Sequence, residues 1–255
     1  MRTRFLRGFW KLTWVEAKVF AREPMGFVGS IIVPTILFIV LGRALGTGMP
    51  AAGSVIAPPE RAPVNMAILA ALVIAIGAVQ SLVAIIAIYR EGGILKRLRA
   101  TPLSPVTILG AHVAVKLAFT VVSLGVMVLA GRRVFPGAMP VNLYSFTGAL
   151  LLGTLSILSL GFVIASLVPT ARFAQPISAV VLYPMLALSG LFFPVAKLPP
   201  VMRGLAFVLP TTHAVSLLQG VWDGSGWAAH WVNALMLVLI FAAFTALSTK
   251  VFRWE

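Results

Sequence analysis

The chain has 255 residues, of which 60% are hydrophobic and 10% are charged, against roughly 45–50% and about 25% in an ordinary soluble domain. This apolar excess is too large for the core of a soluble domain and indicates a protein that faces lipid. The net charge of +14 comes from Lys and Arg beside apolar runs, which argues for anionic headgroups and against nucleic acid, and the lack of Cys excludes disulfides and Cys-based sites.

Residues 1–25 predict an amphipathic helix that lies in the membrane interface. Phe5, Phe9, Leu12, Val15 and Val19 recur at three- and four-residue spacing. We expect this face, flanked by two Trp residues, to lie in lipid. The pattern leaves open whether the helix is a basic anchor alone or also contacts a cytoplasmic partner.

Six apolar runs follow, each near the length of about 20 residues that a transmembrane helix needs. They cover residues 26–45, 64–89, 106–131, 143–168, 175–193 and 229–250. With the N-terminus placed inside, most Lys and Arg residues fall on the inner side, which the positive-inside rule favours. The sequence therefore predicts an all-α, multi-pass integral membrane protein with six transmembrane helices, a single domain over 1–255, and both termini in the cytoplasm.

The loop at 90–105, between the second and third runs, predicts a short amphipathic helix on the cytoplasmic side. Gly92 and Gly93 permit a bend at the membrane exit, and Thr101-Pro102 ends the helix. Alternatively, the basic residues of this loop only keep it on the cytoplasmic side, and the loop binds no partner. The residues that we expect to contact a partner here are Glu91, Gly92, Gly93, Lys96, Arg97, Leu98, Arg99 and Pro102.

An apolar segment at 194–225, before the last run, is interrupted by proline. Its halves are too short to span, and non-helical backbone at membrane depth is tolerated only inside protein or beside water. We therefore expect two short re-entrant or interfacial helices on the outer side. The residues that mark this segment and the turn before it are Ser189, Gly190, Pro194, Pro199 and Pro210.

Two motifs resemble the membrane subunits of ABC exporters of the type-2 permease family, which includes bacterial drug-resistance, polysaccharide and nodulation-factor exporters. One is Arg90-Glu91-Gly92-Gly93 with the stretch 98–105, and the other is the stretch 188–194 with Leu198-Pro199 and 209–212. The family usually has Thr where this chain has Gly93. The resemblance implies that 90–105 forms the coupling helix that contacts an ATPase.

A phosphate-binding Gly-x-x-x-x-Gly-Lys-Ser/Thr loop does not occur in the sequence. The resemblance therefore implies a bacterial inner-membrane exporter driven by two copies of a separate ATPase that bind ATP and Mg, with no cofactor in this chain. It also implies a second permease copy, expected as a homodimer, and a substrate path between the copies. Because the runs lack acidic residues, we expect a hydrophobic or amphipathic cargo, as in multidrug efflux, with a polysaccharide or lipid-linked glycan as the alternative.

Several residues have more than one interpretation. Candidates for the path or dimer interface are Phe38, Gly42, Gly46, Tyr183, Phe192 and Phe193. Lys116 lies within the third run and either has a functional role or extends to the interface, which we favour. Small residues of the fourth run, such as Gly153 and Gly161, favour close helix packing. Two other classes stay open: an intramembrane serine hydrolase using Ser189, and a passive channel. The spacing of the histidines predicts no metal site.

Overall fold

The computed structural model describes residues 2–22, 28–45, 65–93, 105–134, 142–168 and 170–251, and every regular element in these ranges is a helix. The long helices are α4 (Met66–Glu91), α6 (Pro105–Val134), α7 (Leu143–Leu167) and α12 (Trp231–Val251). The shorter elements are α1 (Arg2–Arg22), the π-helix η1 (Val28–Ile32), α3 (Val33–Leu45), α8 (Ala171–Ala187), the 3-10 helix η2 (Val195–Lys197), α9 (Pro200–Val208), α10 (Pro210–Trp222) and α11 (Gly226–Ala229). The prediction of an all-α protein is confirmed for these ranges.

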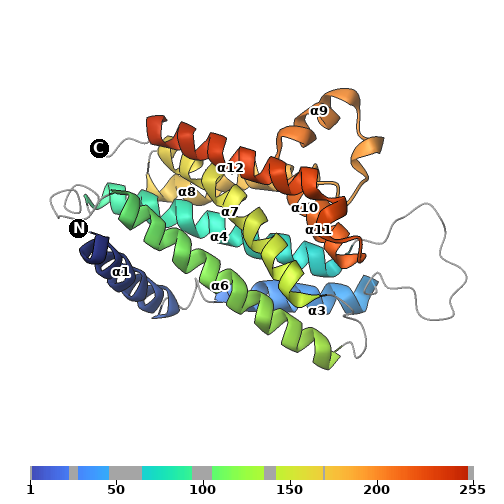
Figure 1. Ribbon diagram of the computed structural model, residues 1–255, viewed down its shortest axis with the longest axis horizontal. Coiled ribbons are helices and arrows are strands. Elements are labelled where there is room, and N and C mark those ends of the chain that lie inside the picture. The colour runs from blue at the N-terminus through green and yellow to red at the C-terminus, as the bar shows by residue number, and fades with distance from the viewer. Residues whose placement is uncertain are drawn as a thin grey trace, which may run out of the picture.

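Successive long helices run back and forth along one axis of the molecule (Figure 1). The start of α1 and the end of α12 lie at one end of this bundle, together with the end of α4 and the starts of α6 and α8. We call this the α1 end. The segment from α9 to α11 lies at the opposite end.

Four helices in the described part are long and apolar enough to cross a membrane: α4, α6, α7 and α12. The number rises to five if α9 and α10, which bend by 80° at Pro210, count as one broken span. The predicted first span is the shorter apolar helix Val28–Arg43, and the predicted fifth span is α8 with 17 residues. Helices long and apolar enough to span a membrane are therefore found at four of the six predicted places.

Helix α4 forms the centre of the bundle and contacts α3, α6, α7 and α8. Ile68, Leu72, Leu82 and Ile86 are each at most 1% exposed. The spanning part of α4 is 61% buried within the chain, whereas that of α12 is 17% buried. A largely apolar helix is suited either to a protein core or to contact with lipid. The two helices have similar composition, but α4 lies in the core and α12 at the periphery.

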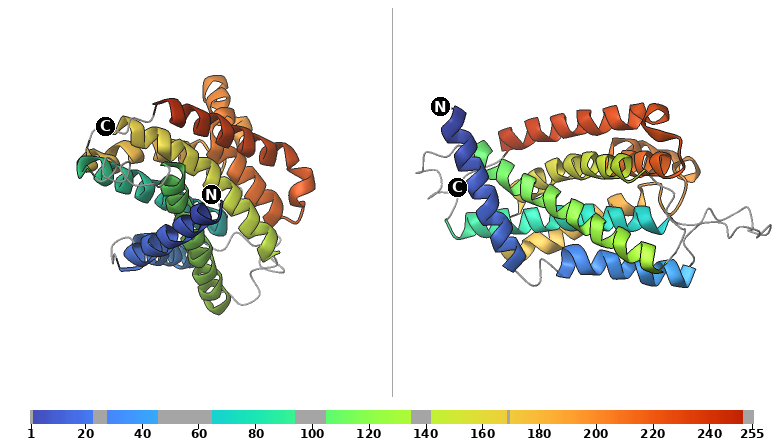
Figure 2. Two further views of the ribbon diagram at one scale, coloured as in Figure 1. Left: turned by 60° about the vertical axis from the view of Figure 1, so that its left-hand side comes forward. Right: turned by 60° about the horizontal axis from the view of Figure 1, so that its bottom comes forward.

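Helix α1 crosses the end of the bundle at a marked angle to the long helices (Figure 2, right). Its helical structure agrees with the sequence, but its apolar stripe is divided between two environments. Phe20 is buried and its ring lies 4.5 Å from that of Phe119 on α6, while Phe9 approaches Gly110 of the same helix. Trp10 and Trp14 are 73% and 61% exposed. The predicted single lipid face is therefore wrong in part: Phe9 contacts α6, whereas Val15, Val19 and the two Trp side chains remain exposed.

The segment before α12 contains the two short helices that its prolines predict. Pro199 and Pro200 begin α9, and Pro210 begins α10, where a missing backbone N–H costs nothing. Gly190 has a φ of +88°, in the left-handed region that glycine adopts without strain, and it turns the chain after α8. Thr211 on α10 donates to the Met185 carbonyl of α8 at 2.9 Å, which fixes the bent pair on the bundle.

The packing of α7 generates a prediction about two glycines. A Cβ at Gly153 would lie 2.9 Å from the Cβ of Ala214 on α10, whereas a Cβ at Gly125 on α6 meets no atom within 4 Å. We expect Gly153→Ala to lower the free energy of unfolding by about 1–3 kcal/mol, since the two helices must separate. Thermal unfolding of the purified chain in detergent measures this.

Gly125→Ala is the matched control, because alanine is favoured over glycine inside a helix. We expect it to leave the midpoint unchanged or raise it. Equal midpoints for both variants would contradict the close contact between α7 and α10.

Candidate functional site

The loop predicted to couple to a partner leaves the bundle at the end of α4. Glu91 is the last residue of α4, and its Oε2 accepts a hydrogen bond from the backbone N of Ala171, the first residue of α8, at 2.9 Å. A carboxylate at a helix N-terminus is stabilised by the unsatisfied N–H groups there. Glu91 therefore holds the start of α8 against the point where the loop begins.

Three neighbours of Glu91 complete this junction. The Arg90 guanidinium donates to the Ser166 carbonyl near the end of α7 at 3.5 Å, which complements the negative end of that helix. Gly92 continues the helical bonding to Ile88, and Gly93, with a φ of +65°, turns the chain away. The remaining predicted coupling residues, Lys96, Arg97, Leu98, Arg99 and Pro102, lie outside the described residues.

A polar cluster attaches α1 to the bundle a short distance from this junction. Glu16 of α1 accepts a hydrogen bond from the Tyr89 hydroxyl of α4 at 2.9 Å, and its other oxygen lies 3.6 Å from Nδ1 of His112 on α6. The Tyr89 and His112 rings meet edge to face at 5.4 Å between centroids. Three helices thus meet at one carboxylate.

Sequence reasoning did not single out Glu16, although a signal for it exists. Leu12, Glu16 and Phe20 follow one another at four-residue spacing, so the acid lies on the apolar face of α1. An acidic residue on such a face requires a polar partner in the surface against which the helix packs.

Lys116 of α6 is buried, with a side chain 5% exposed. Its ammonium donates to the Ser81 hydroxyl of α4 at 2.6 Å and lies 3.9 Å from the centroid of the Phe20 ring. The favoured interpretation, that Lys116 reaches the membrane interface, is therefore replaced by one in which it joins α6 to α4 and α1. Its position in the middle of the run was visible in the sequence, but its partners come from other helices.

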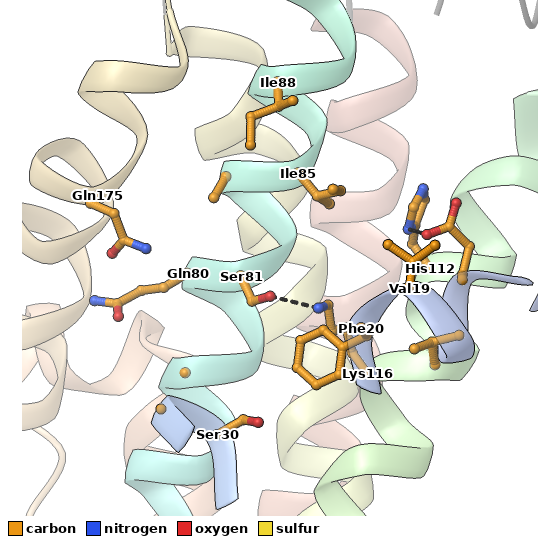
Figure 3. A pocket seen from close by; sticks show the side chains of 15 residues that line it. Val19, Phe20, Ser30, Gln80, Ser81, Ile85, Ile88, His112, Lys116 and Gln175 are labelled. Atoms are coloured by element: carbon orange, nitrogen blue, oxygen red, sulfur yellow. Dashed lines mark hydrogen bonds and ion pairs between the residues drawn. The ribbon is translucent and has the colours of Figure 1, made fainter. Parts of the chain in front are cut away.

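These side chains line a cavity of about 300 Å³ among α1, η1, α4, α6 and α8. Figure 3 shows the Lys116–Ser81 bond at its centre, with Gln80 of α4 and Gln175 of α8 on one side of it and His112 on the other. The polar lining consists of Glu16, Ser30, Gln80, Ser81, His112, Lys116 and Gln175. The cavity therefore combines charged and amide groups in a region that the sequence predicts to be apolar.

The marker residues at the opposite end form a turn followed by the bent pair. The Ser189 hydroxyl donates to the Leu186 carbonyl at 2.6 Å, and Gly190 follows it in the left-handed region. Pro194 precedes η2, Pro199 precedes α9, and Pro210 begins α10. Within the described ranges Ser189 makes no hydrogen bond to a histidine, so the geometry offers the hydrolase alternative no nucleophile–base pair there.

A hydrogen-bond network joins the bent pair to α12 at the same end. His213 of α10 bonds to the Phe207 carbonyl at 2.9 Å and to the Asn233 side chain of α12 at 3.0 Å. Asn233 also donates to Ser216 at 3.0 Å. These contacts hold α9, α10 and α12 together without a charged pair.

The residues predicted to line a path or a dimer interface fall into two groups. Phe38 is 4% exposed in the core and Gly42 is also buried, so both lie inside this chain. Tyr183, Phe192 and Phe193 are 56%, 39% and 66% exposed and are accessible at the surface. Gly46 lies outside the described residues.

Comparison with known proteins gives one family match and several relatives. The family described as ABC-2 type transporter matches residues 7–222. The inner membrane transport permease YhhJ of Escherichia coli (strain K12) is 27% identical over 166 residues, which are 64% of this chain and 44% of YhhJ, and the protein of that name from Shigella flexneri matches equally. Nodulation protein J of Neorhizobium galegae is 35% identical over 65 residues, 26% of this chain and 25% of that protein. The matched region thus spans less than half of the YhhJ proteins.

The cluster at Glu16 generates a prediction about the docking of α1. Glu16→Ala removes the acceptor and Tyr89→Phe removes the donor of the same hydrogen bond. In a double-mutant cycle we expect a coupling of about 0.5–3 kcal/mol in the free energy of unfolding, because the two side chains stabilise one another. Denaturant unfolding in detergent measures the three variants and the parent chain.

Asp223, which ends α10 at the opposite end, provides the control. We expect Glu16→Ala and Asp223→Asn to be additive, since the two residues share no partner. Additivity of Glu16→Ala with Tyr89→Phe would show that α1 is not held by this bond.

Proposed function

The chain belongs to the ABC-2 type transporter family, and from this we propose that it is the membrane-spanning permease of an ATP-driven exporter whose ATPase is a separate chain. The observation that carries the proposal is the junction at Glu91. Its carboxylate joins the end of α4 to the start of α8 where the predicted coupling loop begins. A partner that moves this loop acts directly on two helices.

The helical arrangement supports a topology with six passes. The start of α1 and the end of α12 lie at the same end of the bundle, as an even number of crossings requires (Figure 1). In this topology η1 with α3 forms the first pass, and α8 forms the fifth. Both termini then face the cytoplasm of a bacterial inner membrane, and α9 to α11 face outward.

The exposed side chains suit a second copy of the chain. Tyr183 on α8 and Phe193 after it are more than half exposed and adjoin the bent pair. We propose that two permeases meet across this surface, with two ATPases bound beneath them. The partner ATPases bind the ATP and Mg, and the cargo is a hydrophobic or amphipathic molecule that passes at the interface.

Coupling is tested by changing Glu91 in vesicles that contain the chain and its ATPase. Glu91→Leu removes the acceptor for the Ala171 N–H and frees α8 from the loop junction. We expect substrate transport per ATP hydrolysed to fall roughly 5- to 150-fold, the range of a coupling free energy of 1–3 kcal/mol. The measurement compares transport and ATP hydrolysis in the same vesicles.

Asp223→Asn, at the opposite end, is the matched change of an acidic residue and we expect it to leave the ratio unchanged. Co-purification with an ATPase is measured first on the unaltered chain. A chain that never retains an ATPase refutes the proposal, and an unchanged ratio in Glu91→Leu refutes the role of the junction.

A further inference from the structure

The polar cavity at the α1 end has the chemistry of a headgroup site, and we propose that it binds an amphiphile with a compact anionic head. The inference rests on the proposed function in one respect: it narrows the hydrophobic or amphipathic cargo to molecules that carry a phosphate or carboxylate. A phosphate or carboxylate head is also found on an anionic lipid that stays bound to the protein. Transport measurements distinguish such a resident lipid from a transported cargo.

The cavity is lined by several hydrogen-bond donors. The Lys116 ammonium and the Ser81 hydroxyl meet at 2.6 Å at its centre. The amide groups of Gln80 and Gln175 lie beside them on facing helices (Figure 3). An ammonium that is 5% exposed acts through a low local dielectric, so its attraction for an anion is stronger than at the surface. Oxygen acceptors of a phosphate or carboxylate match this combination of donors.

Glu16 also lines the cavity, and its carboxylate repels an anionic ligand. Both of its oxygens are engaged within the chain: Oε1 accepts from Tyr89 at 2.9 Å and Oε2 lies 3.6 Å from His112. Both oxygens are thereby used in the docking of α1. The head therefore binds on the side of Lys116 and the two amides.

The cavity has an apolar rim. Val19 of α1 and Ile88 of α4 line the cavity and are 50% and 48% exposed. A ligand with its head at Lys116 places its remaining part against these side chains and then in lipid. The volume of about 300 Å³ lies at the lower limit of ordinary ligand pockets and holds a head without its chain.

The test is equilibrium binding of radiolabelled dodecyl phosphate to the full chain in phosphatidylcholine nanodiscs, with the uptake by empty nanodiscs subtracted. We expect saturable binding, and Lys116→Met to weaken it by about tenfold or more, the effect of losing one charge-assisted contact. Lys197→Met, which alters an exposed lysine of η2, is the matched control and should bind like the parent chain. Equal binding by Lys116→Met and the parent overturns the site.

A second variant covers the case in which Lys116→Met does not fold. Gln175 is exposed on α8, so Gln175→Leu leaves the core intact, and we expect a several-fold weaker binding. Competition on the unaltered chain needs no variant at all. If dodecyltrimethylammonium displaces the label as effectively as unlabelled dodecyl phosphate does, the ligand does not need an anionic head. If inorganic phosphate displaces the label as effectively as dodecyl phosphate does, the ligand does not need an apolar chain.

The binding assay contains no ATPase, so its outcome is independent of the exporter proposal. Binding by a chain that never retains an ATPase upholds the site and refutes the proposed function. With the ATPase present, ATP-driven accumulation of dodecyl phosphate in vesicles identifies it as cargo, and saturable binding without accumulation identifies a resident lipid.

Discussion

A bilayer offers no water to a polar group, so each charged side chain within this bundle must find its partner on a neighbouring helix. The α1 end is organised by this requirement. Glu16 meets Tyr89 and His112, and Lys116 meets Ser81 and the Phe20 ring. These contacts determine where α1 lies against α4 and α6, and the cavity is the space that they leave among the helices. At the same end, the exposed carboxylate of Glu91 binds the start of α8.

The two ends of the bundle are held together by different chemistry. Charged side chains join the helices at the α1 end, whereas His213, Asn233 and Ser216 join them through amide, imidazole and hydroxyl groups at the other. Prolines begin α9 and α10 there and produce the 80° bend. An exporter of the proposed kind receives force at one end and releases cargo at the other, and this division gives each end a distinct structure.

Much of the helical architecture could be predicted, because long apolar runs and prolines act locally. The bent pair was also predicted in position, whereas the coupling role of 90–105 stays a prediction. The depth of each helix in the bundle could not be, since α4 and α12 are similarly apolar and only tertiary packing makes one central. Glu16 was missed and Lys116 was misplaced because their partners lie on other helices. Phe38 was expected at a path or interface, but it lies in the core because α3 packs against the rest of the bundle.

The proposed function depends most on an orientation in which the α1 end faces the cytoplasm and the α9 end faces outward. The sequence contains no Cys, so single cysteines report position without background. Lys18 on α1 is exposed and Val201 on α9 is 77% exposed. Labelling of intact cells with a membrane-impermeant maleimide is the most direct measurement. This orientation predicts that Val201→Cys reacts in intact cells and that Lys18→Cys reacts only after the membrane is opened. Reaction of Lys18→Cys in intact cells would contradict this orientation.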